Sequence, residues 1–318
     1  MARKPEPVLI GIDGGGSRTR GVIMRGDVEL DRRETGTARV GTVGVVESSE
    51  RLLNLISELC QSAGVQPMNL DAVAIGLAGV WLPGERQRAQ QLLRLFARER
   101  KIDIKHLKIT SDAGIALEGA FDGDPGMVLI VGTGTIAVGV TPDGEVVRCG
   151  GWGIELSDEG SGAWLGREGL TALTRAFDGR GAGSELVDAM IGLFPVIDAN
   201  NPRTLVAAFH EKMFDYSTVA PLVMQCAENG DAVCREIVDR AAFHLMESVK
   251  VLAGTHFSQV GNTPVVCMGG IMEADTLLAR LVAEQIEAMP SLTLQDPKGS
   301  AIDGALGMAG KMIREGMA

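Results

Sequence analysis

Several features that mark other classes of protein are missing from this chain. Its five cysteines form no C-x-x-C pair and its four histidines no H-E-x-x-H motif, so neither a disulfide framework nor a zinc site is indicated. Thirty lysines and arginines stand against 41 aspartates and glutamates, giving a net charge of −11, and no basic cluster exceeds the scattered arginines of residues 86–101. Because nucleic-acid recognition needs a basic patch, we expect no nucleic-acid partner.

Long apolar runs are also missing. The uncharged stretch Gly126–Pro142 has 17 residues and four glycines, which fits a pair of buried strands better than a membrane helix. Near the N-terminus, Glu6 and Asp13 interrupt any apolar segment typical of a signal peptide. We therefore expect a soluble, cytoplasmic protein without a membrane partner.

Aromatic residues are few (three Trp, one Tyr and eight Phe), whereas glycine is abundant. Glycine accounts for 42 of the 318 residues, against an average near ~7 %. Twelve of these glycines fall between Gly126 and Gly169, but residues 193–253 contain only Gly230. Because glycine lets the backbone approach a ligand or another segment closely, this uneven distribution indicates loops that lie against a ligand or another part of the chain.

Hydrophobic periodicity predicts an α/β chain in two halves. In the first half, strands are expected at 8–13, 20–24, 27–33, 72–77 and 107–110, and helices at 45–59 and 83–98. In the second half, strands are expected at 127–131, 136–140, 145–148, 264–268 and 292–294, mostly helical structure at 161–256, and helices at 276–288 and 303–315. The predicted join lies near residue 115.

Both halves begin with a strand, a glycine turn and a returning strand, which suggests an internal duplication. The turns are Gly14-Gly15-Gly16-Ser17 and Gly132-Thr133-Gly134. The chain has no P-loop motif, and residues 132–137 fit a Rossmann fingerprint weakly because a strand follows them. Each turn by itself could be an ordinary tight hairpin. As a pair they are typical of loops whose backbone N–H groups hold nucleotide phosphates, with Asp13 available for Mg²⁺.

An ordered set of motifs resembles one family. The set comprises Ile10–Ser17, Ser111-Asp112-Ala113, Gly132–Thr135, Gly150-Gly151-Trp152-Gly153, Ser157–Gly162 and Gly269-Gly270. It is similar to the N-acetylglucosamine kinase and glucosamine kinase family, among the BadF/BadG-type ATPases of the actin-like sugar-kinase superfamily. The motifs extend from about residue 8 to 310, and residues 149–153 with 158–161 are their most specific part.

The resemblance implies a fold, an activity and cofactors. The fold would be α/β, with two actin-like (ribonuclease H-like) lobes of mixed sheets flanked by helices, and nucleotide and sugar in the cleft between them. The N-terminal lobe would be 1–115, completed by the last helix at about 303–318, and the larger C-terminal lobe 116–302, with a helical insertion. The activity would be ATP- and Mg²⁺-dependent phosphorylation of the 6-hydroxyl of N-acetylglucosamine, glucosamine or a related hexosamine. We also expect a homodimer.

The resemblance assigns Asp112 as the general base for the sugar hydroxyl. Asp112 follows a strand end, where open α/β sheets bind ligands, although from the sequence alone it could instead cap a helix. Trp152 alone would more often be a core residue. The other implied roles are phosphate binding by Gly14, Gly15, Gly16, Ser17, Gly132, Thr133 and Gly134, sugar binding by Arg39, Asp112, Trp152, Gly153 and Asp158, adenosine binding by Gly269 and Gly270, and Mg²⁺ orientation by Asp13.

Arg39 departs from the family pattern, which commonly has a sugar-contacting asparagine at this position. Arginine is larger, always charged and only donates hydrogen bonds. Its side chain could reach a carboxylate-bearing amino sugar, such as a muramic acid derivative, or it could extend into solvent.

Two alternative functions share the phosphate loops. An activator of a 2-hydroxyacyl-CoA dehydratase would need cysteines to hold an iron–sulfur cluster between subunits, and only Cys149 lies near the predicted lobe interface. A non-catalytic sugar sensor is the other alternative.

Overall fold

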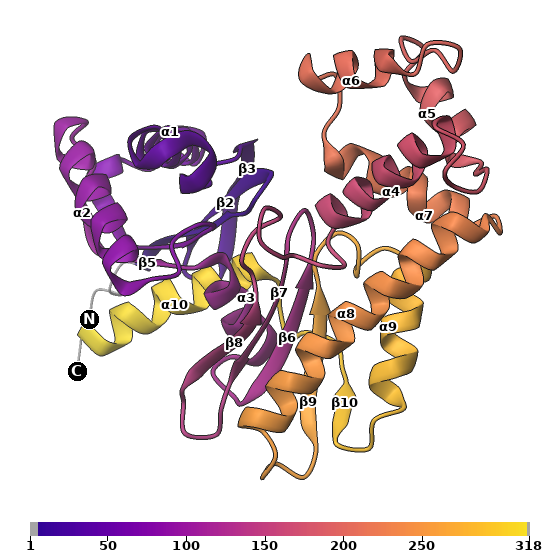
Figure 1. Ribbon diagram of the computed structural model, residues 1–318. Helices are drawn as coiled ribbons and strands as arrows, with labels where there is room; N and C mark the ends of the chain where they lie inside the picture. Colours follow the sequence, from indigo (N-terminus) through magenta and orange to yellow (C-terminus); the bar gives the residue numbers. More distant parts are fainter. Residues whose placement is uncertain (1–5, 317–318) are drawn as a thin grey trace, which may run out of the picture. The chain divides into compact units, whose positions relative to one another are not determined.

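The chain forms two compact units in the computed structural model, which describes residues 6–316 (Figure 1). The first unit extends to Asp124 and also takes in the segment from Asp296 onward; the second is Pro125–Gln295. Each unit contains one mixed five-stranded sheet flanked by helices, so the predicted α/β class is confirmed. The lobe boundaries expected near residues 115 and 302 stay a prediction, and residues 317–318 of the expected last helix lie outside the described residues.

The first sheet has the strand order β3-β2-β1-β4-β5. Its strands are β1 (Val8–Gly14), β2 (Arg18–Arg25), β3 (Val28–Gly36), β4 (Leu70–Leu77) and β5 (Ile104–Thr110). β1 runs parallel to β4, and β4 to β5, whereas β2 is antiparallel to both β1 and β3. The carboxyl ends of β1, β3, β4 and β5 therefore share one end of the sheet.

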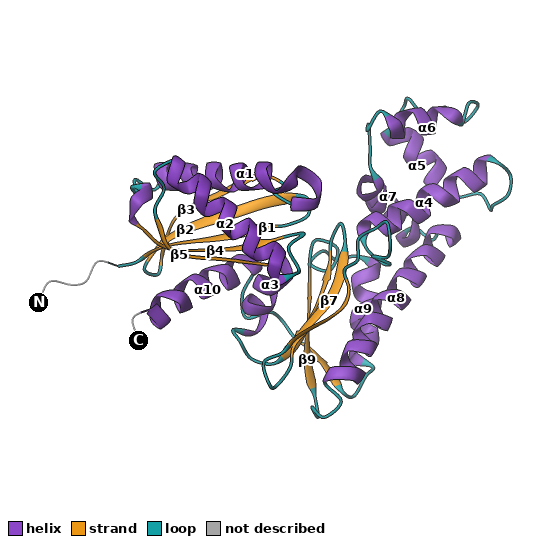
Figure 2. Cartoon of the chain, turned by 60° about the vertical axis from the view of Figure 1, so that its left-hand side comes forward, coloured by secondary structure: helices purple, strands orange, loops and turns teal. Residues whose placement is uncertain are grey.

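Helices cover both faces of the first sheet around its central strands β1 and β4, whose residues are mostly apolar and buried on both sides. The elements are α1 (Val40–Ser62), the short 3₁₀ helix η1 (Pro67–Asn69), α2 (Pro83–Glu99), α3 (Asp112–Phe121) and α10 (Ala301–Gly316). Along β4, Val73 and Ile75 join the core under α1 and α2, while Ala72 and Ala74 pack against α10. This alternation follows from the two-residue period of a strand. Figure 2 shows α10 running beneath this sheet.

Two helices of the first unit approach each other through glycine. A Cβ atom built on Gly304 of α10 would lie 2.0 Å from the carbonyl oxygen of Ile115 in α3, and one on Gly119 would lie 2.1 Å from that of Ser300. These distances are far shorter than van der Waals contact. The close packing of α3 against α10 therefore depends on the missing side chains at these positions.

Replacing Gly304 with alanine should destabilise the first unit by at least about 1–3 kcal/mol, the usual cost of overpacking. Gly307→Ala is the matched control on the same helix, because the nearest atom to its added Cβ is 3.7 Å away, at a Glu118 carboxylate oxygen. An alanine there should stabilise the helix by about 0.5–1 kcal/mol. Urea unfolding followed by circular dichroism measures both changes, and equal midpoints for the two variants would contradict the packing argument.

The second sheet repeats the plan of the first, with the order β10-β9-β6-β7-β8. Its strands are β6 (Gly126–Val131), β7 (Thr135–Val140), β8 (Val146–Gly150), β9 (Thr263–Met268) and β10 (Leu292–Leu294). β7 is antiparallel to β6 and β8, whereas β9 is parallel to β6 and β10. Strand order and direction thus match the first sheet element by element, as an internal duplication would produce.

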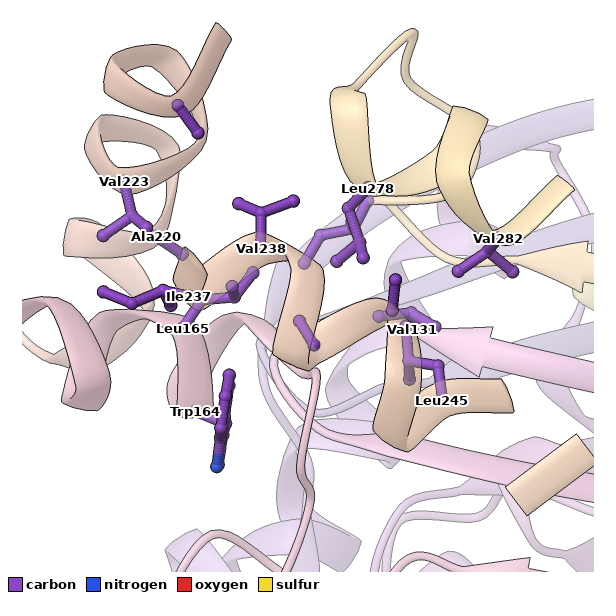
Figure 3. Close-up of a cluster of buried hydrophobic side chains, with 14 of the residues drawn as sticks. Val131, Trp164, Leu165, Ala220, Val223, Ile237, Val238, Leu245, Leu278 and Val282 are labelled. Carbon is purple, nitrogen blue, oxygen red and sulfur yellow. The ribbon is translucent and has the colours of Figure 1, made fainter. Parts of the chain in front are cut away.

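The predicted helical stretch forms most of the second unit's core. It contains α4 (Gly162–Phe177), α5 (Leu186–Leu193), α6 (Arg203–His210), α7 (Tyr216–Glu228) and α8 (Ala232–His256), and α9 (Leu277–Glu287) follows β9. Figure 3 shows Leu165 of α4, Val223 of α7 and Val238 of α8 converging in one buried cluster. Within residues 6–316, no helix is long and apolar enough to cross a membrane.

Candidate active site

Three sequence-predicted site residues meet at the carboxyl end of the first sheet. Asp13 at the end of β1 is in register with Gly76 of β4, and Gly76 is in register with Thr110 of β5, two residues before Asp112. The loop after β3 reaches the same end, where the Val40 N–H donates to the Ala78 carbonyl at 3.3 Å. Arg39 lies in this loop. Asp13, Arg39 and Asp112, which are distant in sequence, are therefore gathered at one end of the sheet.

The first glycine turn is tied to this loop by hydrogen bonds. Thr37 Oγ1 donates to the carbonyl of Gly15 at 3.0 Å, and the Ala38 N–H donates to Thr19 Oγ1 at 2.9 Å. The loop is also held from α1, because the Arg51 guanidinium donates to the Thr37 carbonyl at 2.8 Å. The turn and the Arg39 loop thus form one hydrogen-bonded assembly.

The three glycines of the first turn differ in whether the surrounding protein leaves room for a side chain. A Cβ atom on Gly14 would lie 2.9 Å from the Gly76 carbonyl oxygen, so Gly14 is required by packing. A Cβ on Gly15 would have ordinary contacts beginning at 3.4 Å, and one on Gly16 would meet nothing within 4 Å. The protein itself gives no packing reason for a glycine at Gly16, which leaves room there for a ligand to approach the backbone.

Asp112 is not the helix cap. Ser111 holds that position, its Oγ accepting the N–H of Gly114 at 3.0 Å, and Asp112 is the first residue of α3. The capping alternative for Asp112 was therefore wrong, because the preceding serine supplies the cap oxygen. One Asp112 carboxylate oxygen accepts the adjacent Ala113 N–H at 2.9 Å.

Burial raises the pKa of Asp112 above its ordinary value, because it disfavours the charged carboxylate. The Ala113 N–H and the positive charge of Arg39 act in the opposite direction. The Arg39 side chain is half-buried, and its stem lies beside Gly79, where an added Cβ would come 3.8 Å from Arg39 Cγ. The stem of Arg39 therefore lies at the sheet end, and the choice between sugar and solvent for its guanidinium stays a prediction.

In the second unit, the glycine turn 132–134 sits on the N-terminus of α4. The Gly132 carbonyl accepts the Gly162 N–H at 2.8 Å, and the Thr133 carbonyl accepts the Ala163 N–H at 3.1 Å. A Cβ on Gly132 would meet nothing within 4 Å. Like Gly16 in the first turn, Gly132 therefore has free space where a side chain would be. It lies beside the positive end of the α4 helix dipole.

Asp158 holds two loops of the second unit together. It is only 7 % exposed, and its φ of +60° is unusual for a non-glycine residue. One carboxylate oxygen accepts the Gly153 N–H at 3.0 Å, and the other would lie 2.7 Å from a Cβ on Gly134. The sequence reasoning missed this bridging contact, because nothing in the spacing of Asp158 shows that its carboxylate faces Gly134.

Trp152 is a surface residue in the second unit. Its side chain is 59 % exposed, and the guanidinium carbon of Arg148 lies 4.2 Å from the ring centroid. The core interpretation of Trp152 was therefore wrong. Gly150, Gly151 and Gly153 around it all have positive φ values between 73° and 89°, a conformation that few other residues adopt.

The Gly269-Gly270 pair also reaches the end of the second sheet. Gly269 has φ +97°, and a Cβ there would lie 2.5 Å from the carbonyl oxygen of Val131, the residue before Gly132. Ile271 donates its N–H to the same carbonyl at 3.2 Å. A Cβ on Gly270 would meet nothing within 4 Å. The segments 132–134, 160–163 and 269–271 are thus brought together in this unit.

Asp13 is the residue that could take part in binding a metal. Within the described residues, no three His, Cys, Asp or Glu side chains are grouped to hold an ion by themselves. A single carboxylate beside a phosphate-type turn nevertheless suits Mg²⁺, which keeps several waters and is bound largely by substrate phosphates. The Asp13 carboxylate beside the first glycine turn is therefore suited to a Mg²⁺ ion that is bound mainly by nucleotide phosphates.

Comparison with known proteins identifies the family. The family model described as "BadF/BadG/BcrA/BcrD ATPase family" matches residues 10–309. The chain belongs to this family.

Among its relatives is an N-acetylmuramic acid/N-acetylglucosamine kinase from Clostridium acetobutylicum, 27 % identical over 83 % of this chain and 85 % of that protein. Another is a glucosamine kinase from Vibrio cholerae, 26 % identical over 95 % of both chains. A solved structure from Chromobacterium violaceum, described as a candidate N-acetylglucosamine kinase, has a TM-score of 0.74 at 26 % identity and covers 95 % of this chain and 98 % of that one. The predicted actin-like sugar-kinase fold is confirmed.

Proposed function

We propose that this protein is an ATP-dependent amino-sugar kinase that phosphorylates the 6-hydroxyl of a hexosamine. The observation that carries the proposal is Asp112, a carboxylate that is not used as a helix cap and lies at the end of the sheet with Asp13 and the glycine turn. The substrates named for the relatives, N-acetylglucosamine, glucosamine and N-acetylmuramic acid, support the choice of an amino sugar.

In this proposal Asp112 accepts the proton of the sugar hydroxyl as the hydroxyl oxygen attacks the γ-phosphate of ATP. The carboxylate must be ionised to do so. Burial raises its pKa, which strengthens it as a base, and the charge of Arg39 favours its ionised form. Phosphoryl transfer depends mainly on positioning and charge neutralisation, so a carboxylate is a sufficient base at neutral pH.

The glycine turns are proposed to bind phosphate through backbone N–H groups. These are the turns Gly14-Gly15-Gly16-Ser17 and Gly132-Thr133-Gly134. Asp13 would orient Mg²⁺ or its waters, and the ion would neutralise charge on the phosphate oxygens. We assign the sugar hydroxyls to Asp158, the shape of the sugar pocket to Trp152 and Gly153, and adenosine to Gly269 and Gly270.

An ADP-release assay tests the proposed function. Purified protein with ATP and Mg²⁺ should release ADP only when an amino sugar is added, in a panel of glucosamine, N-acetylglucosamine, N-acetylmuramic acid and glucose. ³¹P NMR of the product should show a phosphomonoester at the 6-position. ATP turnover that is independent of sugar would favour a dehydratase activator, and binding without turnover would favour a sugar sensor; either outcome would overturn the kinase proposal.

Two further expectations accompany the proposal. A kinase that consumes ATP is expected in the cytoplasm, where ATP is abundant. The homodimer expected from the sequence remains a prediction, which light scattering coupled to gel filtration would test.

A further inference from the structure

The backbone of Arg39 is held at the sheet end by hydrogen bonds on both sides of the residue. The Arg39 N–H donates to Thr37 Oγ1 at 3.0 Å, and the Arg39 carbonyl accepts the Thr42 N–H at 3.0 Å. Its stem rests beside Gly79, which follows β4. Because the backbone on both sides of Arg39 is hydrogen-bonded, the fold determines where this side chain begins and which end of the sheet it extends from.

The Arg39 guanidinium makes no hydrogen bond and no ion pair with any described residue. Other half-buried arginines in this chain do have partners: Arg51 contacts Glu47 and the Thr37 carbonyl, and Arg94 donates to the Ile104 carbonyl at 3.3 Å. Within residues 6–316, every fully buried side-chain nitrogen or oxygen has a hydrogen-bond partner. The nitrogens of Arg39 are therefore accessible, and its hydrogen-bond donors are available to a ligand.

The stem of Arg39 lies at the same sheet end as the proposed base, because Gly79 beside it follows β4 and Asp112 follows the neighbouring strand β5. The charge of Arg39 acts on Asp112 without ion-pair contact. A sugar whose hydroxyl is presented to Asp112 would therefore bring other substituents of the same ring toward the guanidinium. Arginine offers a planar pair of donors that matches a carboxylate in two-point contact.

We propose that the substrate is an anionic hexosamine and that Arg39 determines specificity by binding a carboxylate on a ring substituent. This inference rests on the proposed kinase function. The other anion that could occupy the same donors is the phosphoryl group in transfer. The carboxylate is favoured because the Arg39 stem lies beside Gly79, which follows β4, the neighbour of the strand β5 that leads to Asp112. The contact of the same loop with the phosphate turn is made by Thr37, which donates to the Gly15 carbonyl.

The test compares two substrates of nearly the same shape that differ in the charge of one ring substituent, N-acetylmuramic acid and its primary amide. The wild-type protein should have a kcat/KM about 10- to 100-fold higher for the acid, the range expected for a charge-assisted hydrogen bond. In Arg39→Gln this ratio should fall toward one through a higher KM for the acid, and Arg39→Lys should lie between. Loss of the Arg39 charge also alters the pKa of Asp112, but that change affects both sugars equally and cancels in the ratio.

Arg32→Gln is the matched control, because this exposed arginine pairs with Glu29 on the same strand of the first unit; it should leave the ratio unchanged. An equal loss of kcat on both sugars in Arg39→Gln would assign Arg39 to the phosphoryl group and overturn the inference. A wild-type ratio near one would also overturn it while leaving the kinase function intact. If no sugar in either form stimulates ADP release, the proposed function fails, and the inference fails with it.

Discussion

Replacing Asp112 with asparagine is expected to lower kcat for sugar phosphorylation by at least about 10²-fold, the lower range of general-base catalysis. Asparagine keeps the shape of the side chain and can still accept the Ala113 N–H, so the geometry at the start of α3 is retained. It cannot take a proton from the sugar hydroxyl. The measurement is the same ADP-release assay at saturating ATP and sugar.

The same substitution should leave the protein as stable as the wild type or more stable at neutral pH. The pKa of Asp112 is raised in the folded state, so the folded protein loses stability as pH rises from the unfolded pKa of about 4 through the folded pKa. A neutral asparagine does not undergo this loss. Thermal unfolding at pH 7 should therefore show an equal or higher Tm for Asp112→Asn, which separates a catalytic defect from misfolding.

The pH profile gives an independent check on Asp112. Because the ionised carboxylate is the active form, the acid limb of kcat/KM should lie above the ordinary aspartate pKa of about 4. Asp103→Asn, an exposed carboxylate of the first unit, is the matched control and should leave rate and profile unchanged. If Asp112→Asn retains sugar-dependent turnover within about tenfold of the wild type, another group acts as the base.

Replacing Gly16 with valine is expected to raise the KM for ATP by about 10- to 100-fold, corresponding to about 1.4–2.8 kcal/mol of lost binding. The added side chain would meet no protein atom within 4 Å at its Cβ position. It would instead occupy the space through which a phosphate reaches the backbone N–H groups of the turn. Stability should change by no more than about 0.5 kcal/mol, as for other surface substitutions.

Gly14→Ala is the contrasting variant in the same turn. Its Cβ would lie 2.9 Å from the Gly76 carbonyl oxygen, so it should lower the free energy of unfolding of the first unit. Steady-state kinetics with varied ATP, together with urea unfolding, measures both effects. An unchanged KM for ATP in Gly16→Val would remove this turn from the phosphate site.

Much of the fold could be predicted because strand and helix periodicity is a local property. The strand predicted at 292–294 coincides with β10, and that predicted at 8–13 is one residue shorter than β1. Helix α1 begins at Val40, five residues before the predicted start, because a short helical segment precedes Gly44, whose backbone is not helical (φ +79°) and forms a kink. The predicted helix start at residue 45 therefore coincides with the beginning of the regular part of α1, after Gly44.

The site was predicted less completely, because its contacts join segments that are far apart in the chain. Ser111 and Asp112 are both residue types that cap helices, and only the fold decides which of them does so. Asp158 contacts Gly134 and Gly153, and Gly269 contacts Val131. The spacing of these residues in the sequence does not predict such contacts. The exposure of Trp152 likewise depends on which side of its loop faces the protein.

The sequence by itself determined the two-part α/β plan, the family motifs and the positions of the glycine turns, because each depends on residues close together in the chain. The tertiary structure alone decided at which glycines a side chain would clash with the protein and at which it would meet open space, and that Arg39 and Asp112 lie at the same end of the first sheet. The physical reason is that these properties depend on the packing of neighbouring strands, helices and loops. Strand pairing brings the ends of β1, β4 and β5 together, and only then do side chains separated by up to 99 residues, such as Asp13 and Asp112, come to the same end of one sheet.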